Sequence, residues 1–311
     1  MKLLRIGTRG SELALAQTGQ VINALQKLNP GLKCEYTVIS TAGDLRTDIP
    51  LHRVNAVTGT GDKGVFIAAI EEALARGEID CAVHSLKDMP GELDSRFVLA
   101  AVLPRESVED VLVVKSGANM EAPVIATGSV RRMQLVQTYW KGRAGTLPVR
   151  GNVATRLRKL VETPGVDATL LARAGLNRLG YGERISVLGT ELNVIPLPIR
   201  EFPPALGQGA IAVETRSDSP ELTALAASVN HLPTFRCISC ERAFLSLLKA
   251  DCSVPVAGNA SILPDDSLHV HIVYYTPSGK RIDFCRTFAP HVSSSDAAAV
   301  MYETLCAQLR S

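Results

Sequence analysis

Residues 83–90 of the chain read Val-His-Ser-Leu-Lys-Asp-Met-Pro, and this stretch decides where the fold places its polar chemistry. The apolar run 79–83 predicts a strand, and Lys87 and Asp88 stand side by side just after that strand ends. In open α/β sheets, ligands bind beyond the carboxyl ends of the strands. A solvated surface ion pair is the simpler alternative for an isolated Lys-Asp dipeptide. The motifs around it favour the functional interpretation.

The composition of the chain indicates a soluble protein of more than one domain. Its 311 residues, 46% of them hydrophobic, are enough for two or three domains. Seven cysteines, no export signal and no apolar run near the roughly 18 residues of a membrane span predict a reduced, cytoplasmic protein without a membrane partner. The 23 arginines against 10 lysines suit a carboxylate ligand, although GC-rich coding produces the same bias.

The N-terminal segment predicts an anion site. Residues 2–7 are typical of a strand, and residues 11–28 predict an amphipathic helix capped by Ser11. Free N–H groups and the helix dipole point at the turn between them, which holds Arg9. We expect Arg9 and Ser11 to bind an anion there, while a plain surface charge remains the alternative for Arg9.

A glycine-rich segment, Gly-Thr-Gly-Asp-Lys-Gly at residues 59–64, matches the dinucleotide-binding pattern and precedes a predicted helix over residues 65–76. The pattern requires a buried strand that runs directly into the glycines, and residues 51–58 carry His52, Arg53 and Asn55 instead. The segment therefore favours a flexible loop that presents Lys63. A nicotinamide-dependent enzyme would depend on this motif alone.

The region from residue 127 to residue 178 is strongly basic. It holds eight Arg and two Lys against two acidic residues, and Arg131 and Arg132 lie in the first turn of a predicted helix, where they oppose its dipole. Thr127 and Ser129 precede that helix, and the turns further on carry Arg150 and Arg156. We expect this charge to face one crevice that binds a compact polyanionic small molecule. With only two aromatic residues and no nucleic-acid motif, the region does not favour nucleic acid.

The order of predicted elements indicates an α/β fold of two doubly connected lobes plus a small α+β domain. A strand over residues 206–213 follows a complete α/β unit and is expected to return to the first sheet. We therefore predict one lobe from residues 1–103 with 203–220 and a second from residues 104–202. Residues 221–311 form the third domain, with three antiparallel strands and two helices, the first capped by Thr234.

The cysteines fall into two kinds. Cys237 and Cys240 lie three residues apart in a predicted helix, on the same face as Phe244, and no second Cys pair accompanies them, so we interpret them as core residues and expect no metal site. Cys252 follows this helix in a loop, where its thiol is available for covalent chemistry.

These motifs together resemble the porphobilinogen deaminase (hydroxymethylbilane synthase) family along nearly the whole chain. The stretches that carry the resemblance are VHSLKDMP itself, LRIGTRGSELALAQ (4–17), TGSVRRMQL (127–135), VRGNVATRLRKL (149–160), AGLNRLG (174–180), ALGQGAIAVETR (205–216) and CSVPVAG (252–258). The family implies two lobes like those of type II periplasmic binding proteins. It also implies a monomeric enzyme of tetrapyrrole and heme biosynthesis.

The resemblance further implies a dipyrromethane cofactor joined through a thioether to Cys252. Four porphobilinogen molecules would condense head to tail on it with loss of ammonia and give hydroxymethylbilane. Asp88 would be the catalytic carboxylate that stabilises the cation, and it would also contact the cofactor together with Lys87, Thr127, Ser129, Arg131 and Arg132. Substrate carboxylates would be bound by Arg9, Ser11, Lys63, Arg150 and Arg156.

The chemistry of that reaction agrees with the residues. Loss of ammonia leaves a delocalised cation, which needs one fixed carboxylate, and every pyrrole ring adds two carboxylates, which need guanidinium partners. A two-lobed binding protein for a small polycarboxylate is the alternative. Such a protein would have an arginine-lined cleft, but it would normally carry an export signal and needs no loop thiol.

Overall fold

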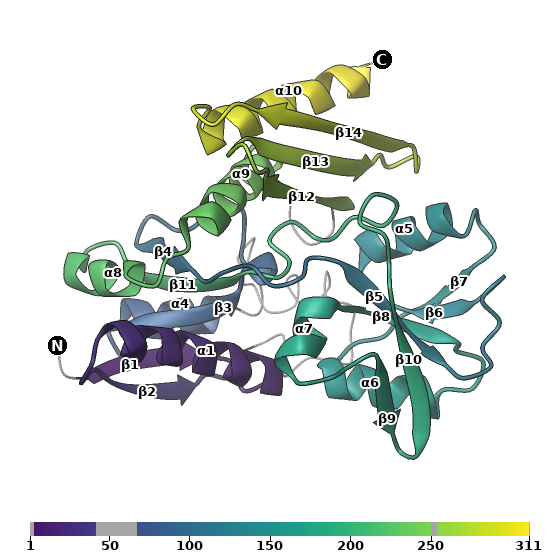
Figure 1. Cartoon of the computed structure of the whole chain (residues 1–311), viewed down its shortest axis with the longest axis horizontal. Helices are drawn as coiled ribbons and strands as arrows, with labels where there is room; N and C mark the ends of the chain where they lie inside the picture. The colour runs from purple at the N-terminus through teal and green to yellow at the C-terminus, as the bar shows by residue number, and fades with distance from the viewer. Residues whose placement is uncertain (1–2, 42–66, 250–253, 311) are drawn as a thin grey trace.

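The computed structural model describes residues 3–41, 67–249 and 254–310. These residues form three sheets, each with its own helices (Figure 1). The first two sheets belong to α/β lobes, and the third belongs to the C-terminal part of the chain. This architecture confirms the predicted fold class.

The first sheet has the strand order β2-β1-β3-β11-β4. Strands β1 and β2 and strands β1 and β3 pair in parallel, whereas β11 is antiparallel to both β3 and β4. Helices α1 and α8 pack on one face, and α4 covers the other. The elements are β1 (Leu3–Thr8), α1 (Glu12–Leu28), β2 (Lys33–Val38), α4 (Ala68–Ala75), β3 (Cys81–Ser85), the 3-10 turn η1 (Leu86–Asp88), β4 (Phe97–Val102), β11 (Ile211–Arg216) and α8 (Pro220–Ala227).

The second sheet has the order β7-β6-β8-β5-β10-β9. Helix α5 packs on one face, and α6 and α7 pack on the other. The elements are β5 (Asp110–Lys115), β6 (Val124–Ala126), α5 (Val130–Tyr139), β7 (Gly145–Leu147), α6 (Val153–Glu162), β8 (Ala168–Ala172), α7 (Arg173–Arg178), β9 (Arg184–Val187) and β10 (Thr190–Pro196). Sequence reasoning missed the β9–β10 hairpin. Its strands are short, few of their residues are buried, and β10 ends in the proline-rich run.

The return to the first sheet is confirmed, since β11 lies between β3 and β4. Its predicted start at Leu206 is wrong, because β11 begins only at Ile211. Gly207 and Gly209 have φ values of 79° and 86°, a left-handed backbone that breaks the extended conformation. Sheet membership agrees with the predicted domain division, whose boundaries stay a prediction.

The C-terminal part forms a three-stranded antiparallel sheet of order β12-β13-β14, packed against two helices. Its elements are α9 (Leu232–Leu248), β12 (Val256–Ile262), β13 (Leu268–Tyr275), β14 (Arg281–Phe288) and α10 (Ser294–Arg310). The expectation that Thr234 caps α9 is wrong. His231 is the cap and accepts from the backbone N–H of Thr234, whereas the Thr234 hydroxyl accepts a hydrogen bond from the N–H of Arg105.

A buried ion pair joins the three parts of the chain. Arg105, on the outgoing connection between the lobes, meets Glu241 of α9 with a 2.6 Å contact. Glu241 also accepts from the backbone N–H groups of Gly207, on the return connection, and Ala260 of β12. This single carboxylate therefore fixes both connections to the C-terminal sheet.

Cys237 and Cys240 lie in the apolar core between α9 and the third sheet, as predicted. Burial raises the pKa of Cys237 to about 11 and that of Cys240 to about 12, so neither is a ready thiolate. Both side chains are therefore structural.

Replacing Cys240 by Ala should lower the free energy of unfolding by about 1–3 kcal/mol, because it removes a fully buried group from a packed core. Thermal unfolding and zinc content by mass spectrometry check this expectation. We expect less than stoichiometric zinc in both the wild type and the variant. One zinc per chain that disappears in both Cys240→Ala and Cys237→Ala would contradict the core assignment.

Candidate functional site

Several of the predicted site residues that the structure describes lie where strands of the two lobes end. Strand β3 runs directly into η1, whose Leu86 is buried and donates its N–H to the carbonyl of Ala210. This anchor leaves Lys87 and Asp88 on the outer side of the turn, half-buried. The turns after β1 and β6 present Arg9 and Ser129 respectively.

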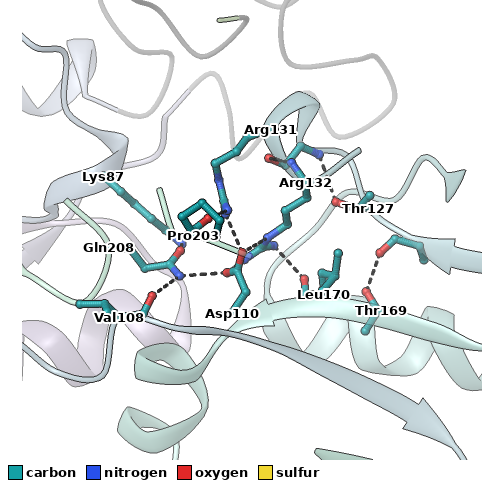
Figure 2. A network of polar contacts seen from close by, with 12 residues as sticks. Lys87, Val108, Asp110, Thr127, Arg131, Arg132, Thr169, Leu170, Pro203 and Gln208 are labelled. Atoms are coloured by element: carbon teal, nitrogen blue, oxygen red, sulfur yellow. Dashed lines mark hydrogen bonds and ion pairs between the residues drawn. The ribbon is translucent and has the colours of Figure 1, made fainter. Parts of the chain in front are cut away.

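One buried carboxylate organises the second lobe's half of the site. Asp110, the first residue of β5, is fully buried and is held by two arginines from the first turn of α5 (Figure 2). Arg131 donates to Oδ2 at 2.8 Å, and Arg132 donates to both oxygens, at 2.7 and 3.2 Å. The remaining contacts of the two arginines go to the carbonyls of Pro203 and Leu170. The chain itself thus provides one anion for these basic residues, and their binding of an anionic ligand stays a prediction.

The charge state of this cluster follows from the balance of burial and pairing. Burial alone would raise the pKa of Asp110, but Arg131 and Arg132 outweigh it and hold that pKa well below its usual range. Asp110 is therefore ionised, and the cluster of one carboxylate and two guanidinium groups carries a net positive charge.

Gln208 connects this cluster to the first lobe (Figure 2). Its amide nitrogen donates to Asp110 at 2.9 Å and to the carbonyl of Val108 at 2.8 Å. Its amide oxygen therefore faces the other way, and Lys87 donates to it at 3.2 Å. Burial, together with nearby Arg132, lowers the pKa of Lys87 to about 8. Lys87 is thus mostly protonated at neutral pH and loses its charge as the pH rises through about 8.

Asp88 is the acidic residue of the turn and lies among cations. Its Oδ2 is 3.8 Å from Nη1 of Arg9, and the side chains of Arg9 and Asp88 keep 23% and 32% of their surface exposed. Burial and the positive charge of Arg132 lower the pKa of Arg156 to about 10. The negative charge of Asp88 raises this pKa, which shows that Asp88 and Arg156 lie near each other. Arg150 adds a further positive charge beside Arg156. The structure thus brings together the two lobes' predicted ligands.

The hydroxyl residues of the site hold the turns in shape. Ser11 and Ser129 are the N-caps of α1 and α5, as expected for Ser11 from the sequence, and they accept from the N–H groups of Ala14 and Arg132. Thr127 is buried and accepts from the N–H of Ser129.

Several residues of the basic region are not at the site, and two of the predicted ligands cannot be located. Lys63 and Cys252 lie outside the described residues. Arg143 and Arg158 are exposed, and Arg158 pairs with Glu162 of its own helix, so the expectation that the whole basic region faces one crevice is wrong for them.

Sequence reasoning missed Arg178. It donates to the carbonyl of Gly209, while its buried Nε finds no partner among the described residues. It lines a cavity of about 30 Å³ between the lobes together with Gln17, Ser85, Lys87 and Gln208. Arg178 is the last residue of α7, not part of a strand-to-helix turn like Arg131 and Arg132, so its signal in the sequence was only its membership of the basic region.

Comparison with known proteins decides the family. The model described as "Porphobilinogen deaminase, dipyromethane cofactor binding domain" matches residues 4–224, and "Porphobilinogen deaminase, C-terminal domain" matches residues 235–289. The chain belongs to the porphobilinogen deaminase family. Members of this family are transferases, and the first matched domain is the one that binds the dipyrromethane cofactor.

Curated members of the porphobilinogen deaminase family match over most of their length. The enzyme of Alkaliphilus metalliredigens is 39% identical over 286 residues, which cover 91% of this chain and 85% of that protein. The enzyme of Rickettsia prowazekii is 39% identical over 274 residues, with 86% of each chain covered. The enzyme of Pelotomaculum thermopropionicum is 38% identical over 301 residues, 96% of this chain and 90% of the other.

Two of the solved structures that align with this chain are substrate-binding domains. Substrate-binding domain 2 of Lactococcus lactis GlnP has a TM-score of 0.41 at 11% identity and covers 74% of this chain and 88% of its own. A substrate-binding domain of an amino acid ABC transporter from Streptococcus pneumoniae has a TM-score of 0.40 at 14% identity, with 74% and 91% covered. These values carry no argument about function. None of the helices in the described ranges combines the length and apolar character needed to cross a bilayer.

The residues present fit a dipyrromethane group. Such a group carries two carboxylates on each ring, and the described cluster offers Lys87 and Arg156 beside the net positive Asp110 cluster. The hydroxyls of Thr127 and Ser129 lie at the same strand-to-helix turn. Several cations around the partly exposed carboxylate of Asp88 are the donor set that a polycarboxylate with pyrrole N–H groups requires.

Replacing Asp110 by Asn should lower the free energy of unfolding by about 3–5 kcal/mol, because it leaves two buried guanidinium groups without their carboxylate. Urea unfolding followed by the fluorescence of Trp140, the chain's one tryptophan and part of this lobe's core, measures the change. Arg158→Ala, an exposed arginine of the same lobe, is the control and should be nearly neutral. Equal stability of Asp110→Asn and the control would contradict the role given to Asp110.

The loss of unfolding free energy in Asp110→Asn should also depend on pH. Because the folded-state pKa of Asp110 lies below the unfolded value of 3.8, its stabilisation is fully present above that value and disappears as pH falls further. The difference in unfolding free energy between wild type and Asp110→Asn should therefore be constant from about pH 5 to 7 and narrow below about pH 4. A difference that grows on acidification would contradict this sign.

Proposed function

We propose that the chain condenses four porphobilinogen molecules head to tail, with loss of ammonia, to give hydroxymethylbilane. The observation that carries this proposal, beside family membership, is the placement of one carboxylate, Asp88, among the cations of both lobes. Asp88 stands in a turn fixed by Leu86 and by the link from Lys87 to Gln208. The carboxylate of Asp88 is therefore held near the positive charges of Arg9 and Arg156.

Asp88 serves the charge that develops in the reaction. When the amino group leaves porphobilinogen as ammonia, the substrate's pyrrole ring becomes cationic, and a carboxylate held in place stabilises that cation without reorganising. The 3.8 Å separation from Arg9 leaves the Asp88 oxygens accessible to pyrrole N–H groups. The ion pair with Arg9 helps to hold the carboxylate in place.

The cations serve the substrate's carboxylates. Each incoming ring brings an acetate and a propionate, and planar guanidinium groups bind such groups bidentately. Arg9 and Ser11 on one lobe, and Arg150 and Arg156 on the other, supply these contacts in our proposal, with Lys63 as a further ligand. Lys87, Thr127, Ser129, Arg131 and Arg132 hold the carboxylates of the cofactor.

The cofactor adds what the protein's side chains lack. When bound, dipyrromethane provides the nucleophilic pyrrole carbon on which the chain of rings grows. In our proposal Cys252 holds it through a thioether, and Lys87 and Asp88 orient the growing end. We also propose that the enzyme is a cytoplasmic monomer. The six described cysteines are free, as expected of a reduced compartment.

Asp88→Asn should lower kcat by several powers of ten, since the loss of one preorganised electrostatic partner costs roughly 3–4 kcal/mol in comparable sites. The amide has nearly the shape of the carboxylate, so folding should be unaffected. Single-turnover consumption of porphobilinogen measures the effect, with Asp94→Asn, an acidic residue in the connection after the turn, as the control. Normal turnover by Asp88→Asn would show that this carboxylate is only a surface charge.

Lys87→Arg should change the alkaline side of the pH profile. Lys87 binds carboxylate only when protonated, so kcat/KM of the wild type should fall as pH rises through about 8. An arginine stays protonated throughout this range, so the variant should lack this decrease even if its overall rate is lower. A profile with the same alkaline limb in both proteins would exclude Lys87 as its origin.

A further inference from the structure

A second buried ionisable pair lies behind the site. Nε2 of His84 in β3 is 2.9 Å from Oε2 of Glu214 in β11, and the two side chains are 3% and 0% exposed. Neither residue touches the carboxylate cluster of Figure 2 through any described contact. The function proposed above leaves this pair without a role.

The two residues occupy strands that both lead to the site. In the antiparallel ladder, His84 lies opposite Ala212 and Glu214 lies opposite Ala82, so the pair crosses the ladder diagonally. Strand β3 continues from His84 into the turn that carries Lys87 and Asp88. In the other direction, β11 begins shortly after the turn that holds Gln208.

The ladder between these strands sets the position of the Lys87–Asp88 turn. Leu86 donates its N–H to Ala210 at 3.1 Å, and a Cβ at Gly207 would lie 2.8 Å from the side chain of Leu86. A shift of β3 along β11 would therefore move Asp88 and would collide with the return connection. The His84–Glu214 hydrogen bond joins a side chain of β3 to a side chain of β11 just before the turn.

Stability alone does not account for the pair. Oε1 of Glu214 is buried without a hydrogen-bond partner among the described residues. Arg242 of α9 lies near enough for Glu214 to raise its pKa, against a larger lowering by burial. A half-satisfied buried carboxylate is costly, and replacing such pairs by apolar residues is often neutral or stabilising. What the directional contact provides is a defined register for the two strands.

We propose that Glu214 is a positioning residue for the reaction, which through its hydrogen bond to His84 holds the end of β3 so that Asp88 faces the reacting centre. The inference rests on the proposed function, because its effect is read in the rate of porphobilinogen consumption. Glu214 itself touches neither Lys87 nor Asp88 in the described contacts, so it acts through the strand.

A double-mutant cycle tests the proposal. Asp88→Glu keeps the charge but displaces it by one methylene, and Glu214→Leu removes the hydrogen bond to His84. In the wild-type background we expect Glu214→Leu to lower kcat at least about 10-fold, with KM changed less than about 3-fold. In the Asp88→Glu background, where the carboxylate is already misplaced, the further loss should be less than about 3-fold. Residues that act on the same step through one group are non-additive in this way.

Two controls separate positioning from a general loss of stability. Asp80→Asn breaks the Arg5–Asp80 ion pair at the opposite end of β3, and it should lower the unfolding temperature while its small effect on kcat is the same in both backgrounds. His84→Gln retains a donor for Glu214 and should keep near wild-type kcat, whereas His84→Leu should reproduce the loss. If Glu214→Leu fails to fold, the same cycle with His84→Leu decides.

The result that overturns the proposal is a folded Glu214→Leu protein with wild-type kcat, or a kcat that Glu214→Leu lowers by the same factor in the wild-type and the Asp88→Glu backgrounds. A wild-type protein that consumes no porphobilinogen would instead overturn the proposed function. The two failures are therefore distinguishable.

Discussion

The buried carboxylate of Asp110 is the interaction on which the site depends. Without it, Arg131 and Arg132 would be two guanidinium groups of like charge in the interior, at the first turn of a helix whose dipole also repels them. With it, they become fixed donors of known orientation at the end of the second sheet where β6 ends and β5 begins. The cluster keeps one excess positive charge, which suits an anionic ligand better than a cluster without net charge would.

The same carboxylate also links the two lobes through a chain of hydrogen bonds. Asp110 fixes the amide of Gln208, the amide fixes Lys87, and Lys87 adjoins Asp88 on the first lobe. Gln208 itself lies on the return connection, next to the Gly207 that is tied to Glu241. The turn that carries Asp88 is therefore held at the meeting point of all three parts of the chain, and its carboxylate stays partly exposed rather than being buried in the fold.

Local patterns predicted most of the described helices and strands, whereas pairs of residues far apart in the sequence could not be predicted from them. The Ser11 cap, the strand before Lys87 and the core position of Cys237 follow from spacing within a few residues. Asp110 gave no signal, because an aspartate at the start of an apolar strand looks like a strand terminus. Sequence reasoning inferred correctly that Arg131 and Arg132 need an anion, but it did not foresee that Asp110 of the chain itself supplies one. Contacts between residues 130 positions apart, such as His84 and Glu214, have no local pattern at all.

Our central claim is that this arrangement serves a covalently primed deaminase, and the mass of the purified wild-type protein tests it most directly. Intact mass spectrometry followed by peptide mapping should show one dipyrromethane adduct per chain, on the peptide that contains Cys252, and brief exposure to porphobilinogen should add masses of whole pyrrole units to that peptide. The Cys252→Ser protein should carry neither. An unmodified, folded wild-type chain that turns over porphobilinogen, or an adduct on another cysteine, would contradict the claim.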